Sequence, residues 1–375
     1  MAKKSFYIFT YGCQMNKNDS EIMAGMLINE CNYDQSAKPD KADILIFNTC
    51  AVRNKAEQRA FSRIREFNGL RKKNKSQQLL ILAGCIPQYE KENIFKEFPY
   101  LDLVIGTNTL EFLPQYLLNK QAKNTIKIEE SKNTKQSATQ ILRSSKDQAW
   151  IPIMYGCNNF CSYCIVPHTR GREVSRKKEE ILTEIEKLKA GSYKEIVLLG
   201  QNVNSYGANL YTDYDFADLL EDVHRFDFLK TINFLTSHPK DISLKLIQTI
   251  ARLPQIGREI HFPLQAGDDE ILQKMNRGYT FNDYKKLTLL IQKWIPDAKI
   301  STDLIVGFPG ETDDQFKNTI KAVKELGFFR VNTAAYSPRK GTAAASMENQ
   351  HSEKIKHERL LLLLEAVSKY AFNKD

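Results

Sequence analysis

Several features that would place this chain in a common class of protein are missing from its sequence. No apolar run approaches the ~20 residues that a membrane-spanning helix needs. Met1 to Phe6 lead directly into a short strand pattern, without the apolar stretch of a secretory signal. There is no Gly-Lys-Ser/Thr phosphate loop and no Gly-x-Gly-x-x-Gly fingerprint, so no motif indicates nucleotide hydrolysis or dinucleotide redox chemistry. We expect a cytoplasmic protein with no membrane segment.

The cysteines do not form the even set of a disulfide scaffold. The chain has seven of them, an odd number, and most lie in turns flanked by Gly or Asn. Small secreted proteins instead pair their cysteines in even numbers at regular spacings. Metal ligation is therefore the better interpretation of the cysteine pattern.

Length and charge set broad limits on the class of protein. The 375 residues suffice for two domains with their own cores, and 42% hydrophobic with 26% charged residues is typical of a globular protein. The formal net charge of +9 favours an acidic partner such as nucleic acid. A generally lysine-rich composition would give the same excess, so charge alone does not decide the partner.

The first part of the chain predicts an amino-terminal parallel α/β domain over residues 1–120. Short apolar strands alternate there with helical patterns, as a parallel sheet requires. The expected strands are Phe6–Phe9, Ile44–Phe47, Leu79–Leu82 and Leu103–Ile105, and the expected helices are Asp19–Asn29 and Lys55–Phe67. Residues 121–148 turn polar and predict a linker, with one short strand at Thr125–Ile128.

A second alternating series predicts a partial barrel over residues 149–345. Six strand and helix units follow one another, which is fewer than the eight of a complete barrel. The expected strands are Ile151–Tyr155, Glu195–Leu199, Thr231–Leu235, Glu259–Pro263, Lys299–Val306 and Arg330–Ala335. The expected helices are Lys177–Lys189, Asp215–Arg225, Ile242–Ala251, Asp283–Gln292 and Asp314–Leu326. Residues 346–375 close the chain with a helix over Ser352–Tyr370, whose Leu360–Leu364 run we expect to be buried.

Three closely spaced cysteines are the most informative motif. Cys157, Cys161 and Cys164 have the spacing CxxxCxxC, and three thiolates can hold three irons of a 4Fe-4S cluster while the fourth iron stays open to a ligand. A zinc knuckle is the alternative, with His168 as the fourth ligand. The spacing, with Tyr163 as the aromatic residue before the last cysteine, resembles the radical S-adenosylmethionine (SAM) enzymes. That resemblance implies that the open iron chelates the amino and carboxylate groups of SAM.

Three further cysteines lie just past the ends of predicted strands in the first domain. Cys13 follows the first strand, Cys50 the second and Cys85 the third. The carboxyl ends of parallel strands meet at one edge of a sheet, so these thiols would come together and could ligate a second cluster. The alternative is three buried cysteines that behave as small hydrophobic residues. Cys31 ends a helix without any such motif, and we interpret it as structural.

Small and polar residues also follow the strands of the second series. At the carboxyl ends of barrel strands such residues can surround a cofactor. They include Gln201, Asn202, Ser237, His238, Gln265 and Gly307. Arg170 and Arg172 follow the cysteine loop, where a guanidinium could bind a phosphate or a carboxylate, or form surface salt bridges instead. Ser237 and His238 could equally cap the following helix.

Several motifs together resemble the radical SAM methylthiotransferases, from Phe6 to about Leu364. They are Tyr11-Gly-Cys-Gln-Met-Asn, Asn48-Thr-Cys-Ala-Val-Arg, the Cys157 loop ending Thr169-Arg-Gly, Met275-Asn-Arg-Gly-Tyr-Thr, Ser301-Thr-Asp-Leu-Ile-Val-Gly-Phe-Pro-Gly-Glu-Thr and Tyr336-Ser-Pro-Arg. Gln-Met-Asn after Cys13 is similar to the MiaB-type branch that modifies tRNA. The branch that modifies a ribosomal-protein aspartate usually has Leu-Gly-Cys-Pro-Lys-Asn there.

This resemblance implies an activity and two cofactor types. Two 4Fe-4S clusters would act with SAM: the cluster on Cys157, Cys161 and Cys164 would generate a 5′-deoxyadenosyl radical, and the amino-terminal cluster would carry or donate sulfur. Carbon 2 of an N6-isopentenyladenosine beside the anticodon would receive the methylthio group. The implied partners are a tRNA anticodon stem-loop and a low-potential electron donor, and we expect a monomer. The implied fold class is an amino-terminal parallel α/β domain followed by a partial (βα)6 radical SAM barrel.

The same resemblance implies roles around SAM for individual residues. Tyr163 and Gly307 would pack on the adenosyl group, although a plain turn is the alternative for Gly307. Gln201 and Asn202 would bind the ribose or the methionine end, with Ser237, His238, Gln265 and Arg170 as further candidates.

Family members usually continue into a small β-barrel that grips RNA, and that module is absent from this sequence, which ends at Asp375. Either the enzyme dispenses with the module or the sequence is truncated. Two other functions stay open: a methylthiotransferase acting on a ribosomal protein side chain, and a non-catalytic metal-cluster RNA-binding protein.

Overall fold

The computed structural model describes residues 3–52, 54–119, 123–129 and 141–371. Contacts divide the chain into two compact units. The first consists of residues 1–156 and 165–174, and the second of residues 157–164 and 175–375. The Cys157–Cys164 segment therefore packs with the second unit, while the residues that flank it pack with the first.

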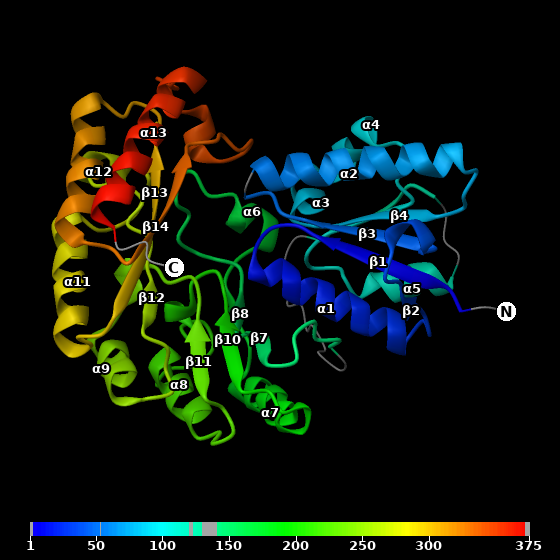
Figure 1. The fold of residues 1–375 in the computed structure, drawn as a ribbon, viewed down its shortest axis with the longest axis horizontal. Helices are drawn as coiled ribbons and strands as arrows, with labels where there is room; N and C mark the ends of the chain where they lie inside the picture. Colours follow the sequence, from blue (N-terminus) through cyan, green and yellow to red (C-terminus); the bar gives the residue numbers. More distant parts are fainter. Residues whose placement is uncertain (1–2, 53, 120–122, 130–140, 372–375) are drawn as a thin grey trace. The chain divides into compact units, whose positions relative to one another are not determined.

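The first unit is built on a six-stranded, fully parallel sheet of order β2-β1-β3-β4-β5-β6 (Figure 1). Its strands are β1 (Ser5–Thr10), β2 (Asp34–Gln35), β3 (Ile44–Thr49), β4 (Leu79–Gly84), β5 (Leu103–Ile105) and β6 (Thr125–Lys127). Its helices are α1 (Gln14–Asn29), α2 (Asn54–Lys73), α3 (Cys85–Glu90), α4 (Ile94–Glu97), α5 (Phe112–Leu118) and α6 (Val166–Arg170). Short strands β7 (Gln148–Pro152), β8 (Met154–Tyr155) and β9 (Val174–Ser175) follow along the chain.

Helices cover both faces of this sheet. Alternate residues of a strand point to opposite faces, so Ile44 and Ile46 of β3 join one core with α1 and α5. Leu45 and Phe47 of the same strand join a second core with α2, α3 and α4 on the other face. Figure 1 shows α1 and α2 on opposite sides of the strands. A sheet buried on both faces explains why its strands are nearly continuous apolar runs.

The parallel α/β prediction for this unit is confirmed, and three details differ. Helix α1 begins at Gln14, five residues before the expected start, and α2 continues to Lys73. The strand expected within the linker is β6, and it pairs with β5 as an edge strand of the sheet. Within the predicted linker, residues 121–122 and 130–140 lie outside the described residues.

The second unit also has parallel strands, each followed by a helix. Strand β10 pairs with β11, and β13 pairs with both β12 and β14. The strands are β10 (Glu195–Leu199), β11 (Thr231–Phe234), β12 (Glu259–His261), β13 (Lys299–Val306) and β14 (Arg330–Ala335). The helices are α7 (Lys178–Leu188), α8 (Phe216–His224), α9 (Leu244–Arg252), α10 (Asp269–Lys274), α11 (Phe281–Trp294), α12 (Asp313–Leu326) and α13 (Glu353–Tyr370). In Figure 1 the labelled helices α7, α8, α9, α11 and α12 are arranged in chain order around the strands.

Side-chain caps fix where several of these helices begin. Thr280 accepts the backbone N–H of Asp283, and the Asp283 carboxylate accepts the N–H of Thr280 in return. Thr312 and Gln315 form the same reciprocal pair at α12. Each cap satisfies backbone donors that a helix leaves unpaired at its first turn. The connection between α10 and α11 and the loop at the carboxyl end of β13 are therefore anchored on the side of the next helix.

The expected burial of the Leu360–Leu364 run is wrong. Leu363 is fully buried, but Leu361, Leu362 and Leu364 are 52%, 53% and 44% exposed. One stripe of α13, with Arg359, Leu363, Ala366 and Val367, packs on the unit. A helix places only every third or fourth residue on one face, so five consecutive leucines cannot all face the same core.

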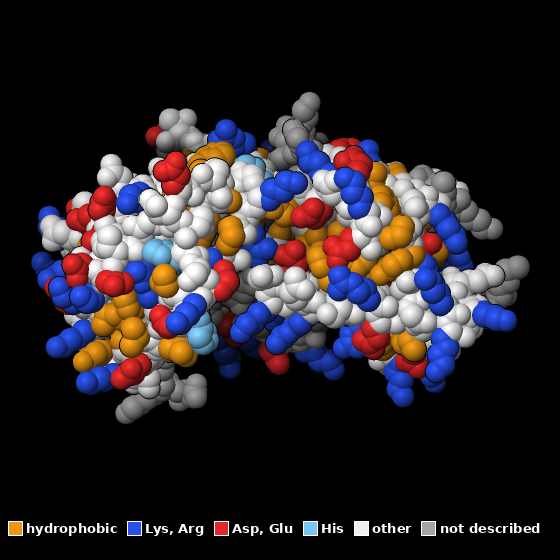
Figure 2. All heavy atoms as spheres, turned by 90° about the horizontal axis from the view of Figure 1, so that it is seen from above, with side chains coloured by type: hydrophobic (Ala, Val, Ile, Leu, Met, Phe, Trp, Pro, Cys, Tyr) orange, Lys and Arg blue, Asp and Glu red, His pale blue; other side chains and the backbone are white. Residues whose placement is uncertain are grey.

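No helix among the described residues is both long and apolar enough to cross a membrane. The surface carries charges of both signs. Figure 2 shows Lys and Arg side chains (blue) interspersed with Asp and Glu (red) over the face that it draws. On that face the positive excess of the sequence is therefore spread out rather than gathered in one patch.

Candidate functional site

Cys13, Cys50 and Cys85 lie at the carboxyl ends of three adjacent strands, as the sequence predicts. Cys13 is the N-cap residue of α1. Cys50 comes directly after β3, and Cys85 comes directly after β4 as the first residue of α3. Since β1, β3 and β4 are neighbours in the sheet, the three cysteines share one edge of the first unit.

Two glycines bring these strand ends into direct contact. A Cβ atom on Gly12, whose φ is +106°, would lie 2.3 Å from the Cβ of Cys50. A Cβ on Gly84, whose φ is +96°, would lie 2.5 Å from the carbonyl oxygen of Thr49. Real Cβ atoms do not approach that closely, and other residues rarely adopt such φ values. Glycine at both positions is therefore what allows the segments that carry Cys13 and Cys85 to pack against the segment that carries Cys50.

The three thiols differ in exposure, and Cys50 and Cys13 both affect the pKa of Cys85. Cys13 is exposed, whereas Cys50 and Cys85 are buried. Burial raises the pKa of Cys85 to about 12, Arg170 opposes that rise, and Cys50 and Cys13 add to it. A charge shifts a pKa more strongly the closer it lies to the titrating group. The structure thus brings together the three cysteines that the sequence assigns to one site.

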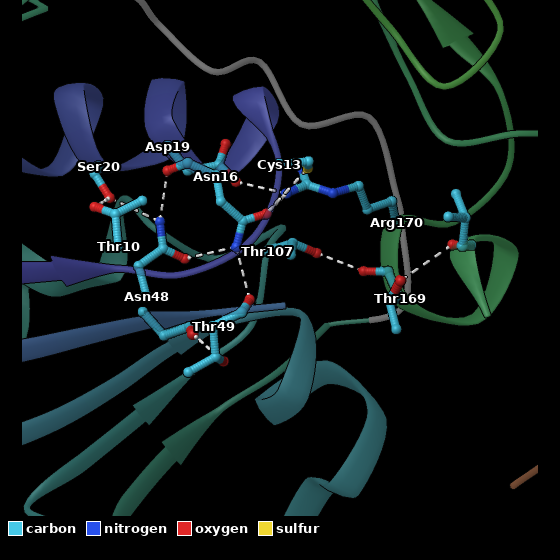
Figure 3. Close-up of polar contacts among 12 residues, drawn as sticks. Thr10, Cys13, Asn16, Asp19, Ser20, Asn48, Thr49, Thr107, Thr169 and Arg170 are labelled. Atoms are coloured by element: carbon cyan, nitrogen blue, oxygen red, sulfur yellow. Dashed lines mark hydrogen bonds and ion pairs between the residues drawn. The ribbon is translucent and has the colours of Figure 1, made fainter. Parts of the chain in front are cut away.

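Asn16 links the cysteine edge to the rest of the unit (Figure 3). Its Nδ2 donates to the carbonyl oxygen of Thr49 at 2.7 Å and to Oδ1 of Asn48 at 3.3 Å. Its Oδ1 accepts from Sγ of Cys13 at 3.5 Å and from Nη2 of Arg170 at 3.0 Å. Asn16 is fully buried, so this network fixes the first turn of α1 against β3. Asn16 ends the sequence motif that begins at Tyr11, but the sequence did not predict this role for it.

Arg170 lies beside this network and not at the surface. Its Nη2 donates to the carboxylate of Asp19 at 2.8 Å, and both side chains are buried. Burial raises the pKa of Asp19, and the Arg170 charge opposes that rise. The alternative of a surface salt bridge is therefore wrong for Arg170. It pairs with a buried carboxylate within electrostatic range of Cys13 and Cys85.

In the second unit, the Cys157–Cys164 loop is fastened to the segment that follows α10. The backbone N–H of Ser162 donates to the carbonyl of Met275 at 3.0 Å, and its Oγ donates to the carbonyl of Lys274 at 2.7 Å. The side chain of Asn276 donates to the carbonyls of Asn159 and Phe160. All three cysteines of the loop are partly exposed. The loop is thus held in place by backbone and amide contacts.

Arg277 is the charged residue that these contacts place beside the loop. Its Nη1 lies 3.2 Å from Sγ of Cys161 and 3.3 Å from the hydroxyl of Tyr163. Its Nη2 donates to the carbonyl of Pro263 at 2.9 Å, and its Nε donates to the hydroxyl of Tyr279 at 2.8 Å. No carboxylate among the described residues forms an ion pair with it. The motif around Arg277 was identified from the sequence, but this role was not.

Four predicted cofactor residues present buried polar atoms that need a partner. Oε1 of Gln201, Oγ of Ser237, Nε2 of His238 and Oε1 of Gln265 have no hydrogen-bond partner among the described residues. They follow β10, β11 and β12 at the carboxyl ends. A buried polar atom without a partner costs about 1–3 kcal/mol, so a polar ligand at these strand ends would relieve that cost. Asn204, which the sequence analysis did not single out, is in the same situation.

Asn202 and His238 form a connected pair. The side chain of Asn202 accepts the backbone N–H of His238 at 3.1 Å and donates to Asp241 at 2.7 Å. Burial, with Arg277 and Lys240 nearby, lowers the pKa of His238 to about 2, so its ring is neutral. Nδ1 of His238 accepts the backbone N–H of Lys240. His238 therefore caps the following turn, which was one of the two roles that the sequence allowed. In this tautomer Nε2 carries the hydrogen and is a donor. Asn202 thus positions His238.

Gly307 has a packing partner within the protein. The space beside its Cα is filled by Lys356 of α13, at 2.7 Å from an added Cβ. Its N–H donates to the buried carboxylate of Glu311 at 2.7 Å, and Glu311 in turn accepts from Arg359 at 2.8 Å. These contacts attach α13 to the end of β13. They account for the glycine without any cofactor.

Cys31 and His168 do not belong to either cysteine triple. Cys31 lies in the apolar core of the first unit, which confirms its structural role. His168 is exposed on α6. Among the described residues, no three His, Cys, Asp or Glu side chains are arranged to hold a single metal ion. A cluster of four irons spaces its thiolates more widely than one ion does.

Comparisons with known proteins also divide the chain into two parts. Residues 5–106 match a family described as "Uncharacterized protein family UPF0004", and residues 151–323 match the radical SAM superfamily. A tRNA-2-methylthio-N(6)-dimethylallyladenosine synthase from Dictyoglomus thermophilum is 48% identical over 347 residues, 92% of this chain and 78% of that protein. An enzyme of the same name from Clostridium botulinum is 45% identical over 99% of this chain and 83% of its own length.

Solved structures share the fold at low identity. The radical SAM methyltransferase TsrM from Kitasatospora setae has a TM-score of 0.66 at 13% identity, over 92% of this chain and 74% of that chain. The cobalamin-dependent SAM radical enzyme OxsB has a TM-score of 0.62 at 12% identity, over 98% of this chain and 56% of that chain. These likenesses concern the fold alone.

Proposed function

The chain belongs to the radical SAM methylthiotransferase family, and from this premise we propose that it adds a methylthio group to carbon 2 of N6-isopentenyladenosine in tRNA. Two cysteine triples carry the proposal, one at the sheet edge of the first unit and one on the Cys157–Cys164 loop. The identity of 45–48% to enzymes named for this reaction supports the tRNA substrate over a protein one.

The residues fit the two cofactor types that this reaction needs. Cys157, Cys161 and Cys164 would hold one 4Fe-4S cluster, and Cys13, Cys50 and Cys85 would hold the other. When bound, the clusters supply an electron for the reductive cleavage of SAM and a site for sulfur. SAM carries an amino group, a carboxylate and ribose hydroxyls, and the unpartnered polar atoms of Gln201, Ser237, His238 and Gln265 can hydrogen-bond such groups.

Individual side chains would bind different groups of SAM, according to whether they are hydrogen-bond donors or acceptors. The neutral His238 offers an N–H donor, and the Gln201 and Gln265 amide oxygens offer acceptors. Asn202 keeps His238 in place through its backbone N–H. Tyr163 would pack on the adenosyl group from within the cysteine loop. Arg170 would act on the other cluster, because its partners belong to the first unit.

The proposal includes the division of the chain predicted from its sequence. Residues 1–120 would form the domain with the second cluster, residues 149–345 the radical SAM barrel, and residues 346–375 the closing helix. The partners would be the anticodon stem-loop of tRNA and a low-potential electron donor, and the protein would act as a monomer. The target adenine must leave its stack to reach the cofactors, as in other enzymes that modify bases.

Mass spectrometry of tRNA nucleosides tests this function. A strain that lacks the gene should lose 2-methylthio-N6-isopentenyladenosine and accumulate N6-isopentenyladenosine. The wild-type gene should restore the product, and a Cys157→Ala gene should not, whereas a Cys31→Ala gene should, because Cys31 lies in an apolar core. Unchanged methylthio-nucleoside levels in the deletion strain would contradict the tRNA proposal and favour a protein substrate.

A further inference from the structure

Arg277 is a buried cation that touches the cysteine loop directly. Only 4% of it is exposed, and no carboxylate among the described residues forms an ion pair with it. Its contacts are the sulfur of Cys161, the hydroxyls of Tyr163 and Tyr279, and the carbonyl of Pro263. Burying an unneutralised charge is costly. The arrangement therefore calls for a negative group close to Arg277.

The position of Arg277 is set by contacts that do not involve its own side chain. Ser162 and Asn276 join the cysteine loop to the segment after α10 through backbone carbonyls. The N–H of Arg277 itself donates to the carbonyl of Leu272 at 3.0 Å. Because the two segments are joined on both sides of Cys161, these bonds hold the backbone of Arg277 beside the loop.

We infer that Arg277 is a positioning residue that raises the reduction potential of the cluster held by Cys157, Cys161 and Cys164. This inference rests on the proposed function, which places a cluster there. Hydrogen bonds to the ligand sulfurs and the net charge around a cluster are two of the factors that set its potential. One-electron reduction adds a negative charge to the cluster, and a cation with an N–H directed at Cys161 stabilises that reduced state.

The test is a redox titration of the cluster that is monitored by electron paramagnetic resonance. The chain with Cys13→Ala, Cys50→Ala and Cys85→Ala keeps the cluster site of the Cys157–Cys164 loop and lacks the other. Dithionite or titanium(III) citrate supplies the single electron. Adding Arg277→Met removes the charge and the N–H donors while keeping a long side chain. We expect the ratio of reduced to oxidised cluster at a fixed solution potential to fall at least about tenfold, which corresponds to about 59 mV for one electron.

Two further variants separate this role from a general effect on packing. Arg258→Met is the matched control, since Arg258 donates to the carbonyls of Ile250 and Ala251 at the end of α9 and touches no cysteine. It should leave the potential unchanged. Arg277→Lys keeps the charge but cannot reach four acceptors at once, so its potential should lie between those of wild type and Arg277→Met.

Each outcome of the titration decides the inference. A wild-type potential in Arg277→Met with full iron content would overturn it. If Arg277→Met holds no iron, Arg277→Lys carries the test, and a potential equal to wild type in that variant would also overturn the inference. A parent chain that binds no iron at the Cys157 loop would instead contradict the proposed function, so the two failures are distinguishable.

Discussion

The two cysteine sites have similar residues but are assembled in different ways. Each combines three cysteines with one buried arginine, Arg170 in the first unit and Arg277 in the second. The first triple is assembled from three strand ends by the parallel sheet. The second triple comes from one loop of eight residues, which backbone and amide contacts fasten to the segment after α10. The first site therefore depends on long-range folding, and the second mostly on local sequence.

The two arginines differ in their counterions. Arg170 pairs with Asp19 at 2.8 Å, so the charge beside Cys13 and Cys85 is balanced within the protein. Arg277 has hydroxyl, carbonyl and sulfur partners. An ionised carboxylate can balance a charge, but these neutral groups can only solvate one. The first arginine thus has its counterion within the protein, whereas the second has no carboxylate partner among the described residues.

The largest expected effect comes from removing one cysteine from each triple. Cys157→Ala should abolish both the cleavage of SAM and the methylthiolated product, because the open iron needs all three ligands of its cluster. Cys50→Ala should abolish the product while 5′-deoxyadenosine still forms. Chromatography of both products after anaerobic incubation with tRNA measures this difference. If the two variants lose the same products, the sites do not divide the work as proposed.

Breaking the ion pair of the first site should have the next largest effect. Arg170→Met leaves Asp19 buried without its cation, and such changes typically cost about 3–5 kcal/mol of unfolding free energy. Arg277→Met leaves no unpaired carboxylate, so its cost should be smaller. Urea denaturation of the apo proteins gives both values. The double variant Arg170→Met with Asp19→Leu should recover much of the loss, and equal losses for the two single arginine variants would contradict the difference in counterions.

The burial of His238, with the charges of Arg277 and Lys240 nearby, should also appear in the dependence of stability on pH. The pKa of His238 is lowered from 6.5 to about 2 in the folded protein. Between those values the unfolded chain binds a proton that the folded chain does not, so stability falls as the pH drops below 6.5. The expected loss is about 1.4 kcal/mol per pH unit. His238→Gln should flatten the stability profile between pH 6.5 and 4.5, and a profile parallel to wild type would show that His238 titrates normally.

The smallest expected effect concerns the hydroxyl that holds Arg277. Tyr279→Phe removes an acceptor for Nε of Arg277 and a donor to the carbonyls of Pro263 and Leu264. Loss of a neutral hydrogen bond typically costs about 0.5–1.5 kcal/mol. Thermal denaturation, compared with Tyr211→Phe as a tyrosine control outside the cysteine loop, measures it. A change larger than that of Arg170→Met would mean that Tyr279 contributes more than its hydrogen bonds.

The sequence was sufficient to predict the parts of the fold that follow from local patterns. Alternation of apolar strands and helices located the sheet of the first unit, and the rule that strand ends share an edge placed Cys13, Cys50 and Cys85 together. The start of α1 was missed because Gln14, Asn16, Lys17 and Asn18 are polar and the segment resembles a loop. In the structure those positions form a helix turn whose Asn16 and Asn18 are fully buried.

Contacts between distant segments could not be predicted in the same way. Arg277 lies 116 positions after Cys161, and no strand end marks it as a neighbour of the loop. Arg170 was identified as a functional candidate, but its pairing with Asp19, 151 positions earlier, depends on the packing of α6 within the first unit. The leucine run of α13 shows the opposite error, in which composition predicted burial that helical geometry does not allow.

The most direct test of the two-site account is the iron content of two triple variants after anaerobic reconstitution. Wild type should bind about eight irons per chain, as two 4Fe-4S clusters. The variant without Cys13, Cys50 and Cys85 and the variant without Cys157, Cys161 and Cys164 should each bind about half of that. A triple variant that retains the full wild-type iron content would contradict the account, because its cysteines would then hold no cluster.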